Sequence, residues 1–439
     1  MYRRAAMARR LRQPAAPIAL LVLLSVASLA VRAAWLGEPC RAPCRSTADH
    51  LLIFDETYYV NAARVIAGIT PPAGETYAGA PQGEDPNSEH PQLAKLVIAG
   101  SIELFGDGPL AWRLGSLLLG SVAILGIFAL TRAAGGSDWL GLGAAALMAA
   151  DNLQIVHGRV GTLDVYALAA MVWGAVLYLR RRPLLAGAVI GVGACCKLVA
   201  PYVLVALALY EVLLIRQGHG GRDALLAAGR RLAICVVSAC AVFVGLLAIL
   251  DRIARPYDAA AGRPLTTGAF HHLGHMLSYA AHQTSPHGPR GIASYPWEWL
   301  VDYKPIVYLN INPARASPGL QHIHPAAHFL GMMSPPVMLL ALPALALACW
   351  RLGHRVRSES GDVAVLGIAW FLGTFAPFLV LSVIWERTSY LYYMVVVMPG
   401  LYLLVAGLVW RWRLRRRLVG VWMLLVLAAA ILMYPFTPL

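Results

Sequence analysis

The sequence predicts an all-α polytopic membrane protein with one transmembrane domain. Hydrophobic residues make up 59% of the 439 residues, and charged residues only 13%. A soluble globule of this length needs more polar surface than that composition supplies. Apolar runs close to the roughly 20 residues that cross a bilayer as a helix recur throughout the chain. The fold class therefore follows from the composition and from the repetition of these runs.

We expect about eleven transmembrane helices in a single domain that covers residues 1–439. Each expected span is an apolar run, counted in turn from a cytoplasmic N-terminus. Two long loops, at residues 37–110 and 251–327, are then expected on the outer face. The spans are expected near residues 15–36, 111–131, 139–156, 163–179, 184–197, 199–215, 232–250, 328–350, 363–384, 391–410 and 418–435.

The distribution of charge orients this bundle. A basic arm at residues 1–14 precedes the first span, and the segments assigned to the cytoplasm hold 21 basic and five acidic residues. Cytoplasmic loops of membrane proteins are enriched in Arg and Lys. We therefore expect a multi-pass plasma-membrane protein with a cytoplasmic N-terminus, and we disfavour a cleaved signal peptide. The net charge of +14 reports this topology, so no nucleic-acid partner is expected.

Function is expected in the two long outer loops, where most of the non-spanning residues lie. In the first loop, residues 55–69 and 92–105 have the amphipathic pattern of helices that lie along a membrane interface. Cys40 and Cys44 flank a short polar stretch, and a disulfide between them is one of two alternatives, the other being two free thiols.

The densest signal for chemistry is the adjacent pair Asp55 and Glu56, just after the first span. Adjacent carboxylates repel each other, and they are useful where one acts as a base with an adjusted pKa or where both bind a cation. The alternative is structural: Asp55 caps a helix and Glu56 decorates its positive N-terminal end. Position alone leaves both readings open.

A second cluster in the first loop runs from Glu89 through His90 to Lys95. Pro91 suits a helix start, which places Lys95 one turn onward, where it can face an anion near the membrane surface. The alternative is an exposed helix start without function. The chain has only three lysines, all expected on or near the outer face: Lys95, Lys197 and Lys304.

Charged residues are also embedded between the third and fourth expected spans, at Asp151, Arg159 and Asp164. Ionisable groups at bilayer depth are costly, so a functional role is the default hypothesis. The alternative is an ion pair of Arg159 with Asp151 or Asp164 that only ties helices together.

Further cations at outer helix ends suit an anionic lipid headgroup, namely Arg113, Lys197 and Arg387. Trp297 lies in an aromatic cluster of the second loop that suits either stacking on a sugar or a place at headgroup level. Tyr393 follows Arg387 in a tyrosine-rich stretch.

Histidines crowd the second loop, and pairs such as His271 with His275 or His322 with His324 suggest a metal site. No cysteine or tight carboxylate set accompanies them. We therefore expect no metal and no cofactor.

Taken together, these motifs resemble the protein O-mannosyltransferase family of the GT-C superfamily, in its compact bacterial form. The family's His-Pro-Pro-Leu-Gly-Lys motif departs here at Gln92 and Ala94, which weakens the subfamily assignment more than the fold. The matching motifs occur in the family's order: Asp55-Glu56, His90 to Lys95, Arg113 in a Trp-Arg-Leu helix start, Arg159 to Asp164 against Arg-x-x-x-Leu-Asp, Lys197, Ser294 to Trp299 against Ser-x-Pro-Trp-x-Trp, and Arg387 to Tyr393.

The resemblance implies an inverting glycosyltransferase at the outer membrane face. Its donor would be polyprenyl-phosphate mannose, a membrane lipid, and its acceptor a Ser or Thr hydroxyl of an exported polypeptide. A carboxylate must take the acceptor's proton, which is the role implied for Asp55 with Glu56 beside it. Donor-phosphate binding is implied for Arg159, Lys197, Arg387 and Lys95. Supporting roles are expected for His90, Arg113, Asp151, Asp164, Trp297 and Tyr393.

Two alternative functions stay open. A related GT-C transferase would move another sugar, such as aminoarabinose or arabinose, to a lipid or cell-wall glycan. A transporter or lipid flippase would also have many spans and intramembrane charges, but it would usually show inverted repeats. The charges here gather near one face, which favours surface chemistry over a translocation path.

Overall fold

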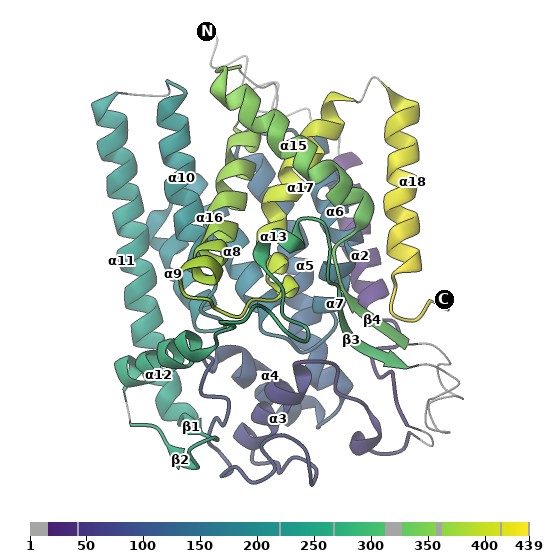
Figure 1. Cartoon of the computed structure of the whole chain (residues 1–439), viewed down its shortest axis with the longest axis vertical. Coiled ribbons are helices and arrows are strands. Elements are labelled where there is room, and N and C mark those ends of the chain that lie inside the picture. Colours follow the sequence, from purple (N-terminus) through teal and green to yellow (C-terminus); the bar gives the residue numbers. More distant parts are fainter. Residues whose placement is uncertain are drawn as a thin grey trace.

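The chain forms a bundle of helices with irregular segments and two short hairpins gathered at one end (Figure 1). The computed structural model describes residues 16–41, 44–218, 221–266, 268–311, 327–356, 362–412 and 415–437. The basic arm at residues 1–14, like His322 and His324, lies outside the described residues.

Eleven helices correspond one by one to the expected spans. They are α2 (Ala16–Ala33), α5 (Pro109–Ala133), α6 (Asp138–Ala150), α8 (Asp164–Leu179), α9 (Pro183–Ala194), α10 (Tyr202–Arg216), α11 (Arg222–Ile253), α15 (Pro335–Gly353), α16 (Val363–Ile384), α17 (Met394–Arg411) and α18 (Arg416–Leu432). Within the described ranges, six segments are long and apolar enough to cross a membrane: α2, α5, α11, α15, α16 and Leu391–Arg411, which includes α17. The multi-pass membrane fold is confirmed, and the number of eleven spans stays a prediction.

Two expected spans differ from the structure. The span at 139–156 is interrupted, because Asp151 ends α6 and its side chain caps α7 (Asn152–His157) by accepting from the Leu153 N–H at 3.0 Å. The span at 328–350 begins as strand β4 (Ala327–Gly331), and its helix starts only at Pro335. Prolines at the first helical positions have the φ angle a helix needs and lose no hydrogen bond there.

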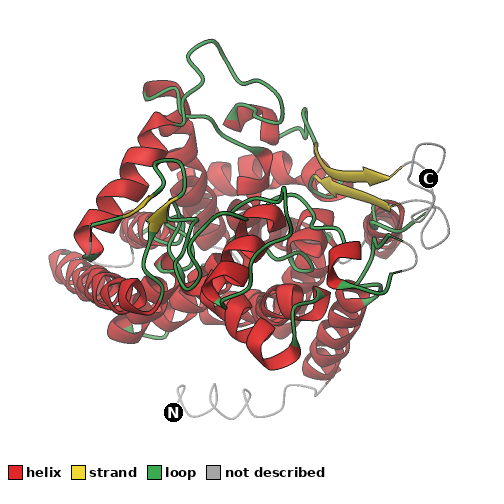
Figure 2. Ribbon diagram, turned by 90° about the horizontal axis from the view of Figure 1, so that it is seen from below, coloured by secondary structure: helices red, strands yellow, loops and turns green. Residues whose placement is uncertain are grey.

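Both long loops lie at the same end of the bundle, as Figure 1 shows, and Figure 2 views the molecule from that end. The interfacial helices predicted in the first loop are present as α3 (Glu56–Ile66) and α4 (Leu93–Phe105). The loops are joined at Asp85, which donates to the Arg255 carbonyl and accepts from the Tyr257 N–H, both at 2.8 Å. The remaining elements of this end are η1 (Thr47–Asp49), β1 (Tyr257–Asp258), β2 (Arg263–Pro264), α12 (Ala269–His282), α13 (Pro296–Trp299), β3 (Ile306–Ile311) and η2 (Leu391–Tyr393).

Small residues let helices approach closely in the core. A Cβ added to Gly400 of α17 would lie 2.8 Å from the Gly367 carbonyl of α16, and one added to Gly373 would lie 2.4 Å from the Ala206 backbone of α10. Membrane helices have no hydrophobic drive to associate within lipid, so close van der Waals packing over small residues carries much of their association. This packing fixes the helix ends that hold the outer loops.

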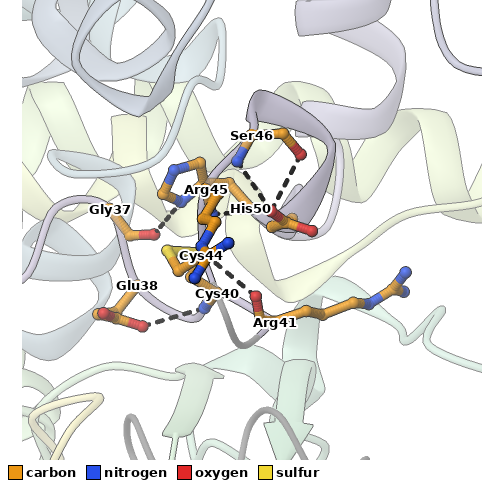
Figure 3. Close-up of a disulfide and its surroundings, with 9 residues drawn as sticks. Gly37, Glu38, Cys40, Arg41, Cys44, Arg45, Ser46 and His50 are labelled. Carbon is orange, nitrogen blue, oxygen red and sulfur yellow. Dashed lines mark hydrogen bonds between the residues drawn. A yellow bond between two sulfur atoms is a disulfide. The ribbon is translucent and has the colours of Figure 1, made fainter.

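Cys40 and Cys44 form a disulfide just after α2 (Figure 3). Nearby, His50 Nδ1 lies 2.7 Å from the Gly37 carbonyl oxygen. Cys40, Cys44 and His50 lie close enough to hold a metal ion, but both sulfurs are bonded to each other and offer no thiolate. The disulfide closes the segment that leads from the first span to Asp55.

Candidate active site

Asp55 lies at the turn into α3, and its carboxylate does not cap the helix. The side chain is partly accessible to solvent. Burial raises the pKa of Asp55 to about 7, while the nearby Lys197 charge lowers it and the Asp164 charge raises it. The nearby Tyr59 hydroxyl also lowers the pKa. A carboxylate with a pKa near the working pH is suited to act as a general base.

Lys197 and Asp164 form a buried ion pair beside Asp55, with 2.7 Å between Nζ and Oδ1. Asp164 begins α8, and Lys197 follows the end of α9. The ammonium also lies over the rings of Tyr392 and Tyr393, at 5.1 and 5.7 Å from their centroids. Within the described residues, the other Asp164 oxygen, Oδ2, is buried without a hydrogen-bond partner. The pair therefore presents one cation and one free acceptor near Asp55.

Glu56 differs from Asp55, because its carboxylate is fully occupied. Arg113 donates to Oε1 from Nε at 2.8 Å and to Oε2 from Nη2 at 2.7 Å. The N–H of Gly161 donates to Oε1 at 2.7 Å, and that of Ile53 donates to Oε2 at 2.8 Å. A carboxylate with four donors has no lone pair left for an acceptor's proton. This geometry favours a bracing role for Glu56 and Arg113 in place of the direct catalytic role predicted for Glu56.

Lys95, predicted to bind the donor phosphate, is fully buried and its three N–H groups are occupied. They contact Asp85 Oδ2 at 2.6 Å, the Asn87 carbonyl at 2.5 Å and the His90 carbonyl at 2.9 Å. Burial lowers the pKa of Lys95, and the Asp85 charge raises it. An ammonium has only three donors, so Lys95 holds the 85–90 segment together and has none left for a phosphate.

We expect Lys95→Met to destabilise the protein by about 3–5 kcal/mol, because Asp85 would stay buried without its partner. Thermal unfolding in detergent measures this effect. The matched control is Lys304→Met, because Lys304 is only half-buried and makes one hydrogen bond, to the Ala293 carbonyl at 2.8 Å. If the Lys95→Met protein were as stable as the wild type but bound the donor more weakly, Lys95 would bind the donor phosphate as first predicted.

The Arg159 guanidinium lies between the segment after α2 and the C-terminal segment. It donates to the Tyr434 hydroxyl at 3.0 Å and to the Ala34 carbonyl at 2.8 Å. It also contacts the rings of Phe329 and Phe436, at 5.6 and 4.9 Å from their centroids. These contacts join the end of α2 to the C-terminal segment, which is a structural role.

The predicted alternative of an Arg159 ion pair with Asp151 or Asp164 is not formed. Asp164 pairs with Lys197, and Asp151 accepts backbone N–H groups of Leu153 and Ser334, each at 3.0 Å. Asp151 thus ties α7 to the start of α15 and takes no part in the Asp55 group.

His90 and Arg387 lie near Lys197. Burial lowers the pKa of His90 well below its usual value, and the charges of Lys197, Lys95 and Arg387 lower it further. The neutral ring packs edge-on against Tyr59 at 5.8 Å. His90 therefore places an uncharged hydrogen-bonding group among the cations of the site.

Arg387 donates to the Ala280 carbonyl and lines a polar cavity of about 270 Å³ between the second loop and the turn after α16. Trp297 lines the same cavity, is 47% exposed, and stacks on Tyr295 at 4.3 Å. Tyr393 stacks on Phe378 at 4.6 Å beneath Lys197. Of the four cations predicted to bind phosphate, Lys197 and Arg387 are the two whose surroundings suit it.

An aromatic group that was not predicted from the sequence surrounds the site. Phe54 precedes Asp55, Tyr308 lies on β3, His157 ends α7, and Tyr392 lies in η2. Their rings contact one another across these four segments. The β3–β4 hairpin that brings Tyr308 here was not expected, because its second strand was assigned to a membrane span.

Comparisons with known proteins agree on the family. Residues 89–249 match the family model described as dolichyl-phosphate-mannose-protein mannosyltransferase. The polyprenol-phosphate-mannose–protein mannosyltransferase of Mycolicibacterium smegmatis is 24% identical over 372 residues, covering 72% of this chain and 70% of that protein. Over 72% of its length the chain is thus similar to a protein O-mannosyltransferase.

A second relative of the same name, from Corynebacterium glutamicum, is 32% identical over 136 residues, which are 30% of this chain and 26% of the relative's length. Among solved structures, the S. cerevisiae protein O-mannosyltransferase Pmt1-Pmt2 complex bound to the sugar donor aligns with a TM-score of 0.67 at 12% identity. The alignment covers 95% of this chain and 89% of that one. ArnT from Cupriavidus metallidurans bound to undecaprenyl phosphate aligns with a TM-score of 0.56 at 19% identity, covering 94% and 63%. These structures establish that the chain has the GT-C fold.

Proposed function

We propose that this protein is an O-mannosyltransferase that transfers mannose from polyprenyl-phosphate mannose to Ser or Thr hydroxyls of exported polypeptides, with inversion at the anomeric carbon. The names of the relatives support the donor and the acceptor class. The observation that carries the mechanism is Asp55, a carboxylate whose pKa is raised to about 7 beside the buried Lys197–Asp164 pair. A base and a phosphate-binding cation thus lie side by side.

Transfer is a single displacement. The acceptor oxygen attacks the anomeric carbon, the bond from that carbon to the phosphate oxygen breaks, and the acceptor's proton passes to Asp55. The electron pair of the broken bond stays on the departing lipid phosphate, whose charge Lys197 and Arg387 stabilise. The leaving group is already a lipid phosphate, so this step requires no nucleotide.

The reaction is assigned to the outer face of the plasma membrane. The long loops that form the site lie at the bundle end opposite the connections rich in arginine. Arginine-rich connections mark the cytoplasmic side. The donor's hydrocarbon chain then lies in the bilayer, with its phosphate at the level of Lys197.

The deciding experiment is transfer from radiolabelled polyprenyl-phosphate mannose in membranes that contain the protein, followed by separation of protein, lipid and glycan. Label in protein supports the proposal. Label in lipid or glycan would keep the mechanism but replace the acceptor. Label in none of the fractions would overturn mannose as the transferred sugar.

Activity should rise with pH through an apparent pKa near 7, because only ionised Asp55 accepts a proton and its pKa is raised to about 7. The donor is a phosphodiester with no second ionisation in this range. The rise in activity with pH therefore reports a titrating group of the protein. The measurement is kcat/KM for a threonine peptide between about pH 5 and pH 9. A profile that stays flat below pH 7 would contradict the assignment of Asp55 as the base.

A further inference from the structure

The backbone just before Asp55 adopts a conformation that its sequence does not favour. Phe54 has a φ of +55°, in the left-handed region. A bulky residue reaches this region only where its surroundings hold it there, and such strain is commonest at functional sites. The direction of the Asp55 side chain depends on this φ angle, because the next residue is Asp55 itself. Contacts that fix the Phe54 backbone therefore also fix the direction of the Asp55 side chain.

The Phe54 ring is held between two tyrosines. It stacks on Tyr308, with centroids 4.2 Å apart and planes 17° apart, and it meets the edge of Tyr392 at 5.6 Å. Lys197 Nζ lies 5.1 Å from the Tyr392 centroid. Aromatic pairs in these geometries attract beyond the area they bury. The same aromatic group thus includes the residue next to the proposed base and contacts the proposed phosphate-binding cation.

Tyr308 is directed towards the site by an irregularity of the β3–β4 hairpin. Val307 pairs with Leu330 and Leu309 pairs with Phe329, which leaves Tyr308 as an unpaired residue at a β-bulge. A bulge adds a residue to one strand and re-aims its side chain. Tyr308 is 7% exposed and belongs to a loop more than 250 residues from Phe54 in sequence.

Two further contacts fix the Tyr308 ring. Its hydroxyl shares a hydrogen bond of 2.8 Å with His157 Nε2, and His157 Nδ1 lies 3.2 Å from the Thr162 hydroxyl. Gly331, on the opposite strand, leaves room for the ring: a Cβ there would lie 2.4 Å from the Tyr308 hydroxyl oxygen and 2.4 Å from Cζ. The Tyr308 ring can therefore occupy this position only because residue 331 is a glycine.

We propose that Tyr308 is a positioning residue for Asp55. By stacking on Phe54, it holds the left-handed backbone that points the Asp55 carboxylate at the acceptor. The β3–β4 hairpin, which contributes none of the proposed reacting groups, thus sets the catalytic geometry. This inference rests on the proposed function, because it assumes that Asp55 is the base.

The same packing affects the ionisation of Asp55. Burial is the largest cause of its raised pKa, and Lys197, Asp164 and Tyr59 are the charged and titratable neighbours that modify it. Displacing Tyr308 releases the Phe54 ring and admits water to Asp55. The apparent pKa should then fall towards the ordinary carboxyl value, because a hydrated carboxylate ionises more readily.

The first test is Gly331→Ala, with Gly353→Ala as the matched control. A Cβ at Gly331 collides with the phenol, whereas a Cβ at Gly353 has open space around it. We expect Gly331→Ala to lower kcat by about ten- to a hundredfold, as small misplacements of catalytic groups do. KM for the donor should stay close to the wild-type value, and Gly353→Ala should leave both constants unchanged.

A second variant separates positioning from folding. Tyr308→Val combined with Gly331→Ala removes the collision and should recover part of the lost thermal stability, but it also removes the ring on which Phe54 stacks. We expect this double variant to unfold at a higher temperature than Gly331→Ala and to keep a low kcat. Recovery of kcat together with stability would overturn the proposal and leave Tyr308 with a packing role only.

A third measurement needs no turnover. Water-soluble carbodiimide modifies protonated carboxyl groups, so its rate at Asp55, followed by peptide mass spectrometry across pH, reports the ionisation of Asp55. The midpoint should be lower in Gly331→Ala and in the double variant than in wild type and Gly353→Ala. An identical midpoint in all four proteins would overturn the proposal. Failure of the proposed function itself would give a different result. Either the Asp55→Asn protein would still transfer mannose, or the wild type would transfer none.

Discussion

Asp55→Asn should lower mannosyl transfer by about 10²–10⁴-fold, the range that a positioned general base contributes. Asparagine keeps the size of the side chain but accepts no proton. The carboxylate makes no helix-capping bond, so the helix α3 should form as before. The measurement is kcat with polyprenyl-phosphate mannose and a threonine peptide, alongside the thermal unfolding temperature.

The control for this variant is Glu103→Gln, which removes an exposed carboxylate from α4 in the same outer loop. It should leave both rate and stability unchanged. If Asp55→Asn retains more than about a tenth of the wild-type rate, the proton must go elsewhere. His90 would then be the next candidate, since it is a neutral imidazole among the cations of the site.

Glu56→Gln should act on stability, with an expected loss of about 3–5 kcal/mol. The variant leaves the buried Arg113 guanidinium without a counter-charge, and removal of one partner of a buried pair costs this much. It also replaces one of the two oxygens that accept from the N–H groups of Gly161 and Ile53, so one of these donors then faces an NH2 group. Chemical unfolding of the detergent-solubilised protein measures the change, again with Glu103→Gln beside it.

Removing both charges of the pair separates the two explanations for Glu56. Glu56→Leu combined with Arg113→Met should recover part of the stability, because apolar replacements of a buried ion pair are often tolerated. By contrast, a Glu56→Gln protein that unfolds like the wild type but transfers no mannose would assign Glu56 to the chemistry. The two neighbouring carboxylates are thus distinguished by their variants: the Asp55 variant should lose activity, and the Glu56 variant should lose stability.

The multi-pass membrane fold was predictable from the sequence, as was the outer loop in which we place the site. Hydropathy is a local property, so each apolar run predicts a helix without knowledge of its neighbours. The amphipathic pattern of the first loop predicted α3 and α4, and the adjacent acids after the first span identified Asp55. Even here the local rule failed at residues 328–331, which are apolar enough to resemble part of a span and instead lie in strand β4.

The partners of each charged residue, by contrast, could be seen only in the folded chain. Lys95 and Lys197 look alike in sequence, yet Lys95 is enclosed by Asp85 and two carbonyls, while Lys197 pairs with Asp164 beside Asp55. Glu56 meets Arg113 across 57 residues, and Tyr308 reaches Phe54 from the second loop. The energy of a charge or ring depends on the partners within a few ångströms, and those partners come from distant segments. No local pattern records them, so the roles of these residues follow from the fold.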